Sequence, residues 1–402
     1  MSHPILKKII LEISLFLITL SAFYFFWQKS LPLVSPIALI ETIYQPQTKN
    51  KKVVYGFLPY WNLKYADELQ INHLTHLAYF AVDLNEDGTI NKKVNSRELE
   101  PGWNKLNSDI TSRVLYQAKL LKQKTVLTIT AMDPDLIMSI VNNPQNSSTA
   151  FNSILEVYQK FNFDGLNVDF EYVGEPDNQT IQNFTLFIKN LQQECKKVSP
   201  VCFIDIDVFG DSASKKRLWD LENLHPYVEH IIVMAYDYYR KSSPQAGPVA
   251  PLTGSCKGES QAPCLEQDIL QHLSLFTKKV PQNKLVLGVP FYGYEWQTAS
   301  EDFLSNTYPK TGSLATYQRI QEIIKDPQIS SLSSKWSSTT LSPYLVFYEN
   351  KNIQQIHYEN QQSLKLKIDV LKATNLGGLA IWALGYEVPS QDLWQPIQQL
   401  NK

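Results

Sequence analysis

Two of the three carboxyl side chains in the segment Asp164-Gly-Leu-Asn-Val-Asp-Phe-Glu171, those of Asp169 and Glu171, alternate with apolar residues. Successive side chains of a β-strand point to opposite faces, so Asn167, Asp169 and Glu171 share one face. Like charges held close together in a partly dry site raise the pKa of one group and leave the other ionised. This spacing therefore predicts an acid, Glu171, with Asp169 as its partner. The alternative is a surface strand with alternating acids, against which the Leu, Val and Phe between them argue.

Other catalytic chemistries find less support in the sequence. His73 and His76 are three residues apart without a third metal ligand in view, so we interpret them as structural histidines. No G-x-S-x-G motif presents a serine nucleophile, and no glycine-rich nucleotide motif follows a strand-like run. The net charge of -2 and pI near 6.4 give no electrostatic footprint for nucleic acid. We expect no metal, no cofactor and no nucleic-acid partner.

The elements that would position the carboxyls form a repeating pattern. Eight short apolar runs have strand length, at residues 53–58, 74–82, 125–130, 165–170, 202–208, 230–236, 285–290 and 378–382. Helix-period segments lie between most of them, at residues 110–123, 148–160, 180–195 and 363–374. Eight alternations are typical of the α/β class and of a closed (β/α)8 TIM barrel, whose active sites lie at the carboxyl ends of the strands. Glu171 occupies such an end.

The interval between the seventh and eighth predicted strands, about residues 291–377, is too long for one crossover. It contains β-rich runs at residues 344–348 and 353–357, separated by the turn-like residues 349–352. We expect a small α+β insertion between strands 7 and 8 of the barrel.

The N-terminal segment differs in composition from the rest. Lys7 and Lys8 precede an apolar run at residues 9–27 that is just long enough to span a bilayer, and no clear signal-peptidase site follows. We expect residues 1–28 to be a membrane anchor, with a cleaved signal peptide or a buried core helix as alternatives, and residues 29–52 to be a linker. The domain at residues 53–402 would then lie outside the cytoplasm, anchored to the membrane or secreted.

The four cysteines form two close pairs, Cys195 with Cys202 and Cys256 with Cys264. Two local disulfides in an exported domain fit this spacing. The alternative is four free thiols in a cytosolic protein, since no spacing typical of zinc ligands occurs.

The strand motif resembles that of glycoside hydrolase family 18, D-x-x-D-x-D-x-E. Asp164, Asn167, Asp169 and Glu171 fall on its four positions, with Asn167 departing from the usual Asp. Further family motifs are matched by Met-Ala-Tyr-Asp at 234–237, Leu-Gly-Val-Pro-Phe-Tyr-Gly at 287–293 and Gly-Gly-Leu-Ala-Ile-Trp at 377–382. The usual S-x-G-G of strand three is missing, and Thr-Ile-Thr-Ala-Met at 128–132 stands in its place.

Within the family, the chain is most similar to the di-N-acetylchitobiases and their bacterial relatives, including spore-cortex glucosaminidases. That subgroup also tends to have Asn at the second motif position. The segment at residues 357–363, followed by Lys365, resembles the motif that precedes the subgroup's last helix. The resemblance spans residues 53 to about 390.

The resemblance implies a substrate-assisted, retaining hydrolase of β-linked N-acetylglucosamine-containing glycans. The substrate stays open between chitin oligomers, peptidoglycan and the core of N-linked glycans. Glu171 would protonate the leaving oxygen, Asp169 would orient the substrate's acetamido group, and Tyr236 would donate its hydroxyl to the acetamido oxygen. Trp382 would form the floor beneath the sugar. The remaining implied residues are the supporting Asn167, Asp164 and Asp237 and the substrate-binding Met234, Trp61 and Tyr292.

Each role has a structural alternative. Tyr236 and Trp382 could be core residues, and Asp237 could cap a helix. Trp61 and Trp296 are expected on the barrel rim, as sugar-stacking or as merely exposed aromatic residues.

Asn167 cannot ionise, so we expect the usual third carboxylate to be absent and the pKa of Asp169 to depend on Glu171 and burial alone. Two rival functions remain: a non-catalytic glycan-binding barrel, and a membrane-tethered interaction protein that uses the insertion as its functional surface.

Overall fold

The computed structural model describes residues 51–255 and 264–401, and Lys52–Lys402 forms a compact unit of its own. Within the described ranges no helix is long and apolar enough to cross a membrane. This finding overturns the expectation of a membrane-spanning helix, and of the membrane as a partner, as far as the described chain extends. The apolar run at residues 9–27, on which that expectation rested, lies outside the described residues.

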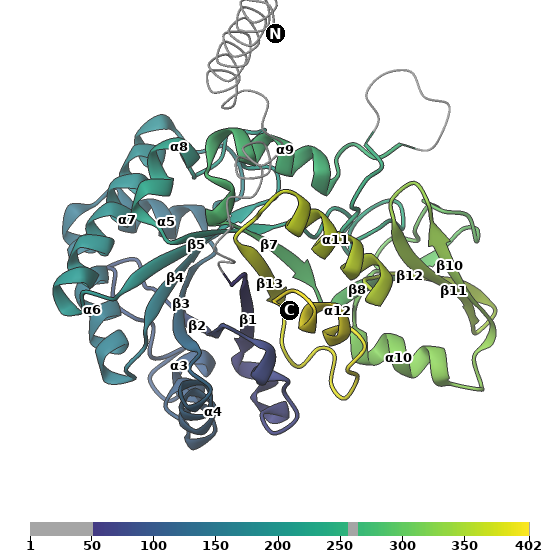
Figure 1. Ribbon diagram of the computed structural model, residues 1–402, viewed down its shortest axis with the longest axis horizontal. Coiled ribbons are helices and arrows are strands. Elements are labelled where there is room, and N and C mark those ends of the chain that lie inside the picture. Colours follow the sequence, from purple (N-terminus) through teal and green to yellow (C-terminus); the bar gives the residue numbers. More distant parts are fainter. Residues whose placement is uncertain (1–50, 256–263, 402) are drawn as a thin grey trace, which may run out of the picture. The chain divides into compact units, whose positions relative to one another are not determined.

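Eight parallel strands close into a barrel in the order β1-β13-β7-β6-β5-β4-β3-β2, with the helices outside it (Figure 1). The predicted TIM barrel and all eight predicted strands are confirmed, and the strand ends shift by only one or two residues. The strands are β1 (Val53–Pro59), β2 (His76–Asp83), β3 (Lys124–Ala131), β4 (Gly165–Phe170), β5 (Phe203–Phe209), β6 (His230–Met234), β7 (Leu285–Pro290) and β13 (Gly378–Trp382).

Most of the helices begin where the sequence supplies a capping side chain. From backbone N–H groups of the first helical turn, Asp133 accepts two hydrogen bonds and Asn143 accepts one, and a proline follows each of them at the first helical position. The helices of the barrel region are α3 (Pro101–Leu106), α4 (Asp109–Leu120), α5 (Pro134–Val141), α6 (Pro144–Lys160), α7 (Asn178–Val198), α8 (Leu221–Leu224), α9 (Ile269–Lys279), α11 (Gln361–Ala373) and α12 (Trp394–Gln398). All four predicted helices are among them.

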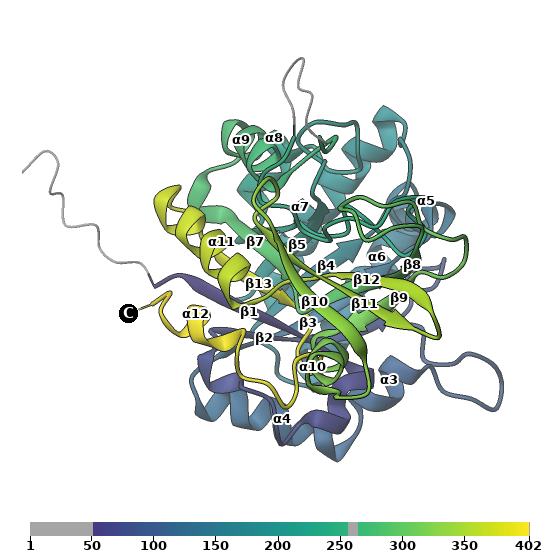
Figure 2. The same ribbon diagram turned by 90° about the vertical axis from the view of Figure 1, so that its right-hand side faces the viewer.

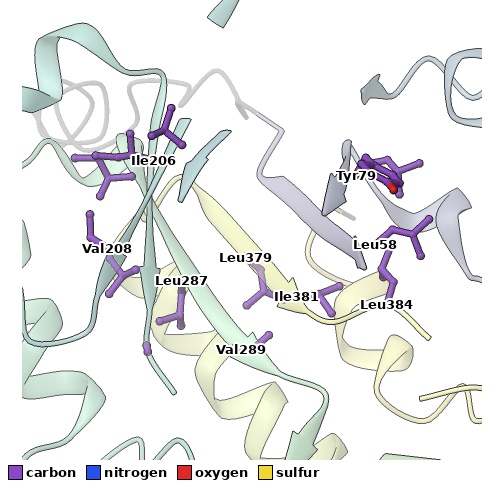
Figure 3. Packing of buried hydrophobic residues seen from close by; sticks show 14 of the residues in the cluster. Leu58, Tyr79, Ile206, Val208, Leu287, Val289, Leu379, Ile381 and Leu384 are labelled. Atoms are coloured by element: carbon purple, nitrogen blue, oxygen red, sulfur yellow. The ribbon is translucent and has the colours of Figure 1, made fainter. Parts of the chain in front are cut away.

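Each barrel strand has one face that packs against the helices and one that faces the barrel interior. On β4 the outward set packs beneath the helices: the Phe170 ring lies 5.6 Å from that of Phe187 on α7, measured between centroids. Figure 3 shows the same outward layer on other strands, including Ile206, Val208, Leu287, Val289, Leu379 and Ile381. The inward set of the barrel is a separate small apolar cluster, which consists of Tyr55, Phe57, Ala78, Val126, Ile232, Val286 and Ala380. The prediction of which side chains of β4 face inward and which face outward is therefore confirmed.

An antiparallel sheet in the order β10-β11-β12-β8-β9 fills the interval between β7 and β13 (Figures 1 and 2). Its elements are β8 (Tyr292–Thr298), β9 (Ser313–Thr316), α10 (Tyr317–Lys325), β10 (Ser330–Ser337), β11 (Ser342–Glu349) and β12 (Asn352–His357). The predicted hairpin is β11 and β12. Asn350 and Lys351 at its turn both have positive φ angles, 52° and 69°, as a type I′ hairpin turn requires.

The insertion begins earlier than the hairpin alone indicates, because β8 follows β7 after a single residue. Trp296 therefore lies within this sheet and is fully buried. The expectation that it stands on the barrel rim is wrong.

One predicted disulfide is present, between Cys195 on α7 and Cys202 just before β5, and both residues are buried. Cys264 is also disulfide-bonded. Its predicted partner, Cys256, lies outside the described residues.

Candidate active site

A cavity of about 250 Å³ opens at the carboxyl ends of the barrel strands. It is lined by Phe57, Phe80, Met132, Asp169, Glu171, Asp207, Met234, Tyr236, Asp237, Tyr292, Tyr294, Leu314 and Trp382. Six residues predicted from the sequence to act on or bind substrate meet here, namely Glu171, Asp169, Tyr236, Met234, Tyr292 and Trp382, together with the supporting Asp237.

Glu171 directly follows β4, and its backbone N–H donates to the carbonyl of Ala131 at the end of β3, 2.9 Å away. Burial raises the pKa of its carboxyl above the usual range, the charge of Asp237 adds to the shift, and Arg240 opposes it. A carboxyl with a raised pKa keeps its proton closer to neutral pH, as a general acid requires.

Asp169 lies two residues deeper on the same face and is buried, and its Oδ1 has no hydrogen-bond partner. Its pKa is raised well above the usual value by burial, then by the charge of Asp207 and then by that of Glu171. The expectation that only burial and Glu171 set this pKa is wrong, because a second acidic neighbour acts on Asp169.

That neighbour, Asp207 on β5, was not identified from the sequence. Asn167 donates from Nδ2 to Asp207 Oδ2 across 2.5 Å, so the amide contacts the adjacent strand. A third carboxylate is therefore present after all, supplied by β5 instead of β4. Within the described ranges, no group of three His, Cys, Asp or Glu side chains is arranged to hold a metal ion.

Tyr236 follows β6 and lies against β7, where Gly288 leaves room for its ring. A Cβ atom at position 288 would stand 3.1 Å from Tyr236 Cε1 and 2.6 Å from the carbonyl oxygen of Val233. Burial, followed by the nearby carboxylates, raises the pKa of the Tyr236 phenol. The hydroxyl therefore stays protonated and able to donate at neutral pH.

Asp237 has a left-handed backbone with φ of 61°. It does not cap a described helix, because its carboxylate accepts hydrogen bonds from two tyrosines of β8: Tyr292 at 2.5 Å and Tyr294 at 3.0 Å. These bonds connect the inserted sheet to the loop after β6. Tyr294 is a further pocket residue that the sequence reasoning missed.

A cluster of aromatic rings surrounds Trp382 at the cavity. Trp382, the last residue of β13, has its ring centroid 4.6 Å from that of Phe80 and 5.9 Å from that of Phe57. Trp61, in the 3-10 helix Tyr60–Tyr65, lies 6.4 Å from Trp382 and is 41% exposed. Trp61 thus stands on the rim as predicted.

Asp164 does not reach the cavity. It precedes β4 at the opposite end of the barrel, where it accepts hydrogen bonds from the backbone N–H and the hydroxyl of Thr125, at 2.8 and 3.0 Å. Its contacts join the start of β3 to β4. The first position of the motif is therefore structural in this chain.

A second cavity of about 490 Å³ adjoins the first and shares Glu171, Met234, Tyr236 and Asp237 with it. It extends away from Trp382, over the loops after β5 and β6. Asp211, Arg217, Tyr238 and Arg240 are among its lining residues.

The sequence model of the glycosyl hydrolases family 18 matches residues 45–387. The chain belongs to this family. Among the chain's relatives, the putative sporulation-specific glycosylase YdhD of Bacillus subtilis is 22% identical over 285 residues, which are 70% of this chain and 61% of that protein. The probable di-N-acetylchitobiase 2 of Dictyostelium discoideum is 26% identical over 286 residues, 64% of this chain and 71% of that protein.

Solved structures share the fold. The group IV chitinase of Ostrinia furnacalis superposes with a TM-score of 0.73 at 20% identity, covering 87% of this chain and 98% of that one. A class V chitinase from Nicotiana tobaccum in complex with NAG4 gives the same TM-score, identity and coverage. The expected family is thus confirmed, and so is the expected similarity to chitobiases and to bacterial enzymes such as the cortical fragment-lytic enzyme of B. subtilis, which is 22% identical over 82% of this chain.

Proposed function

We propose that residues 53–402 form a glycoside hydrolase domain that cleaves β-linked N-acetylglucosamine-containing glycans with retention of configuration. The observation that carries the proposal is a single cavity in which a partly buried carboxyl with a raised pKa, Glu171, lies beside Asp169, Tyr236 and the indole of Trp382.

In the first step, Glu171 donates its proton to the glycosidic oxygen and the leaving sugar departs. The carbonyl oxygen of the substrate's own 2-acetamido group attacks the anomeric carbon and gives an oxazolinium ion. Asp169 accepts a hydrogen bond from the acetamido N–H, and Tyr236 donates one to the acetamido oxygen. These two contacts hold the attacking group in place, and fixed geometry of this kind lowers the barrier.

In the second step, the Glu171 carboxylate takes a proton from water, and the water oxygen opens the oxazolinium ion from the side that the leaving group vacated. Two inversions at one carbon give net retention, and Glu171 regains its proton. Trp382 supplies the apolar surface beneath the ring during both steps.

The second cavity supports binding of the leaving part of the glycan. It shares Glu171 with the first cavity and extends away from Trp382, which is the direction that a leaving sugar protonated by Glu171 requires. A volume of about 490 Å³ has room for at least one further sugar unit.

We further propose that the domain works outside the cytoplasm. The Cys195–Cys202 disulfide supports an oxidising compartment. Chitin oligomers and peptidoglycan are the favoured substrates, since the relatives' names include both chitobiases and a cortical fragment-lytic enzyme.

The test is incubation of the domain with chitooligosaccharides, peptidoglycan and N-glycans, followed by mass spectrometry of the products. We expect N-acetylglucosamine-terminated fragments from one of the first two substrates. We also expect Glu171→Gln to reduce kcat by a factor of about 10² to 10⁴, the range for loss of a general acid.

The rival function, a barrel that only binds glycans, predicts retention of chitooligosaccharides without products. Absence of products from all three substrates, or product formation unchanged in Glu171→Gln, contradicts the catalytic proposal. If calorimetry detects binding of a chitooligosaccharide that the protein does not cleave, the result supports the glycan-binding function.

A further inference from the structure

We propose that Asp207 is a positioning residue that shares one proton with Asp169 and takes over that proton when substrate binds. The inference rests on the proposed function, because Asp169 can accept a charge-assisted hydrogen bond from the acetamido N–H only in its ionised form.

The geometry places the two carboxyls in one buried group. Asp169 and Asp207 lie on neighbouring strands, are 4% and 3% exposed, and line the same cavity. Asn167 donates to Asp207 across 2.5 Å, whereas Asp169 Oδ1 has no hydrogen-bond partner. Of the two groups, Asp207 thus has the better support for a negative charge, and Asp169 is the better place for a proton in the empty pocket.

Among the described residues, the groups that face Asp207 supply no compensating positive charge. From β4 these are Asn167, Asp169 and Glu171, from β1 the phenol of Tyr55, and from the loop after β6 the phenol of Tyr236. The next acid along β5, Asp205, also faces it.

Asp205 is in a different position from Asp207. His230 donates to its carboxylate from the backbone N–H and lies with Nδ1 within 3.0 Å of it. The hydrogen-bond partner of Asp207 is instead the neutral side-chain amide of Asn167. Burial and the other carboxylates accordingly raise the pKa values of both Asp207 and Asp169. Two such carboxyls lose their protons as a pair, the first proton at a lower pH and the second at a higher pH than a lone carboxyl would.

The transfer balances without any outside group. In the empty pocket Asp169 holds the proton and Asp207 is ionised. When the acetamido N–H arrives, the proton moves from Asp169 to Asp207, Asp169 becomes the acceptor, and the charge of the pair stays at one negative unit. Substrate binding then requires no proton release to solvent over a wide pH range.

The test compares four proteins: wild type, Asp207→Asn, the double variant Asn167→Asp/Asp207→Asn, and Asp177→Asn as a matched control. Asp177 is the exposed N-cap of α7 and asparagine also caps helices, so the control makes the same charge change outside the pocket. The measurement is kcat/KM for a chitooligosaccharide across the pH range.

In Asp207→Asn the lone Asp169 must release its proton to solvent. We expect the acid limb of the kcat/KM profile to move to higher pH by about one unit, with roughly tenfold lower activity on that limb and little loss at alkaline pH. The double variant places a carboxyl beside Asp169 again, so the acid limb of its kcat/KM profile should return toward the lower pH of the wild type. The control should follow the wild type.

A loss of activity that is equal at every pH, an unchanged acid limb in Asp207→Asn, or a double variant that keeps the shifted limb would overturn the proposal. If the wild type cleaves none of the glycans, the proposed function fails, but the proton shared by Asp169 and Asp207 can still be tested. Infrared titration of the free protein should then show a protonated buried carboxyl that persists to higher pH in the wild type than in Asp207→Asn. Equal persistence contradicts the shared proton.

Discussion

At the scale of single residues, the features that would let Glu171 act as an acid also make it costly to bury. Its pKa is raised chiefly by burial, which means that the folded protein favours the protonated form more than the unfolded chain does. The stabilisation from this preference is fully present below the pKa of the unfolded chain, near 4.3. It is lost as the pH rises through the higher pKa of the folded state.

Glu171→Gln should therefore stabilise the protein at neutral pH. Glutamine has nearly the same shape but cannot ionise, so the variant avoids the cost of holding a charge at this partly buried position. At pH 4, where the carboxyl is mostly protonated in both states, wild type and variant should unfold at closer temperatures than at pH 7.5. Melting curves at pH 4 and pH 7.5 check this, with Glu156→Gln, exposed on α6, as the control. If the variant is less stable than wild type at pH 7.5, this would contradict the claim that the ionised Glu171 side chain destabilises the folded protein.

The sequence located most of the pocket because its motifs fall at strand ends. It did not reveal Asp207, although residues 203–209 alternate acidic and apolar side chains just as β4 does. The same argument about strand faces, applied to β5, predicts that Asp205 and Asp207 point inward. The contact between Asn167 and Asp207 could not be predicted, because it depends on the register between β4 and β5, which is a tertiary property.

At the scale of elements, periodicity was enough to predict the barrel strands, since a buried parallel strand is a short apolar run. It was insufficient for Trp296, because β8 follows β7 so closely that the residue belongs to the inserted sheet and not to the rim. The close packing of β6 against β7 is likewise visible only in three dimensions.

At Gly288 on β7, this packing leaves the space that the Tyr236 ring occupies. Gly288→Ala places a methyl group 2.6 Å from the Val233 carbonyl oxygen and 3.1 Å from the Tyr236 ring, so one of them must move. A small displacement of a positioning group can cost a large factor in rate. We expect kcat to fall at least about tenfold.

The matched control is Gly56→Ala on β1, where the atoms nearest to the new methyl group would be the side-chain ends of Leu74 and Leu384. That variant should lose stability and keep kcat per folded molecule. Equal kcat losses in the two variants would contradict a specific effect on Tyr236.

At the scale of the whole molecule, the inserted sheet rejoins the barrel through a buried ion pair. Glu359 follows β12, Lys367 lies on α11, and their side chains are 1% and 0% exposed with Nζ and Oε1 2.6 Å apart. The sequence drew attention to Lys365 in this segment, but Lys365 pairs with Asp369 at the surface. Which lysine is buried depends on the rotation of α11 against the barrel.

Lys367→Met should destabilise the fold by about 3–5 kcal/mol, because Glu359 is left buried without its partner. The loss should be smaller at acid pH, since burial raises the pKa of Glu359 and removal of the lysine raises it further, so that the carboxyl becomes neutral. Lys365→Met, on the same helix, should cost no more than about 0.5 kcal/mol. Urea unfolding at pH 5 and pH 7.5 measures these differences.

The double variant Lys367→Met/Glu359→Leu decides whether the pair stabilises the junction or only avoids an unpaired charge. Two apolar side chains of similar volume often replace a buried ion pair without net loss. We expect the double variant to recover most of the stability that Lys367→Met loses, with kcat per folded molecule unchanged, because neither residue lines the cavity. A double variant as unstable as the single one would mean that the pair itself, with its geometry, holds the insertion against the barrel.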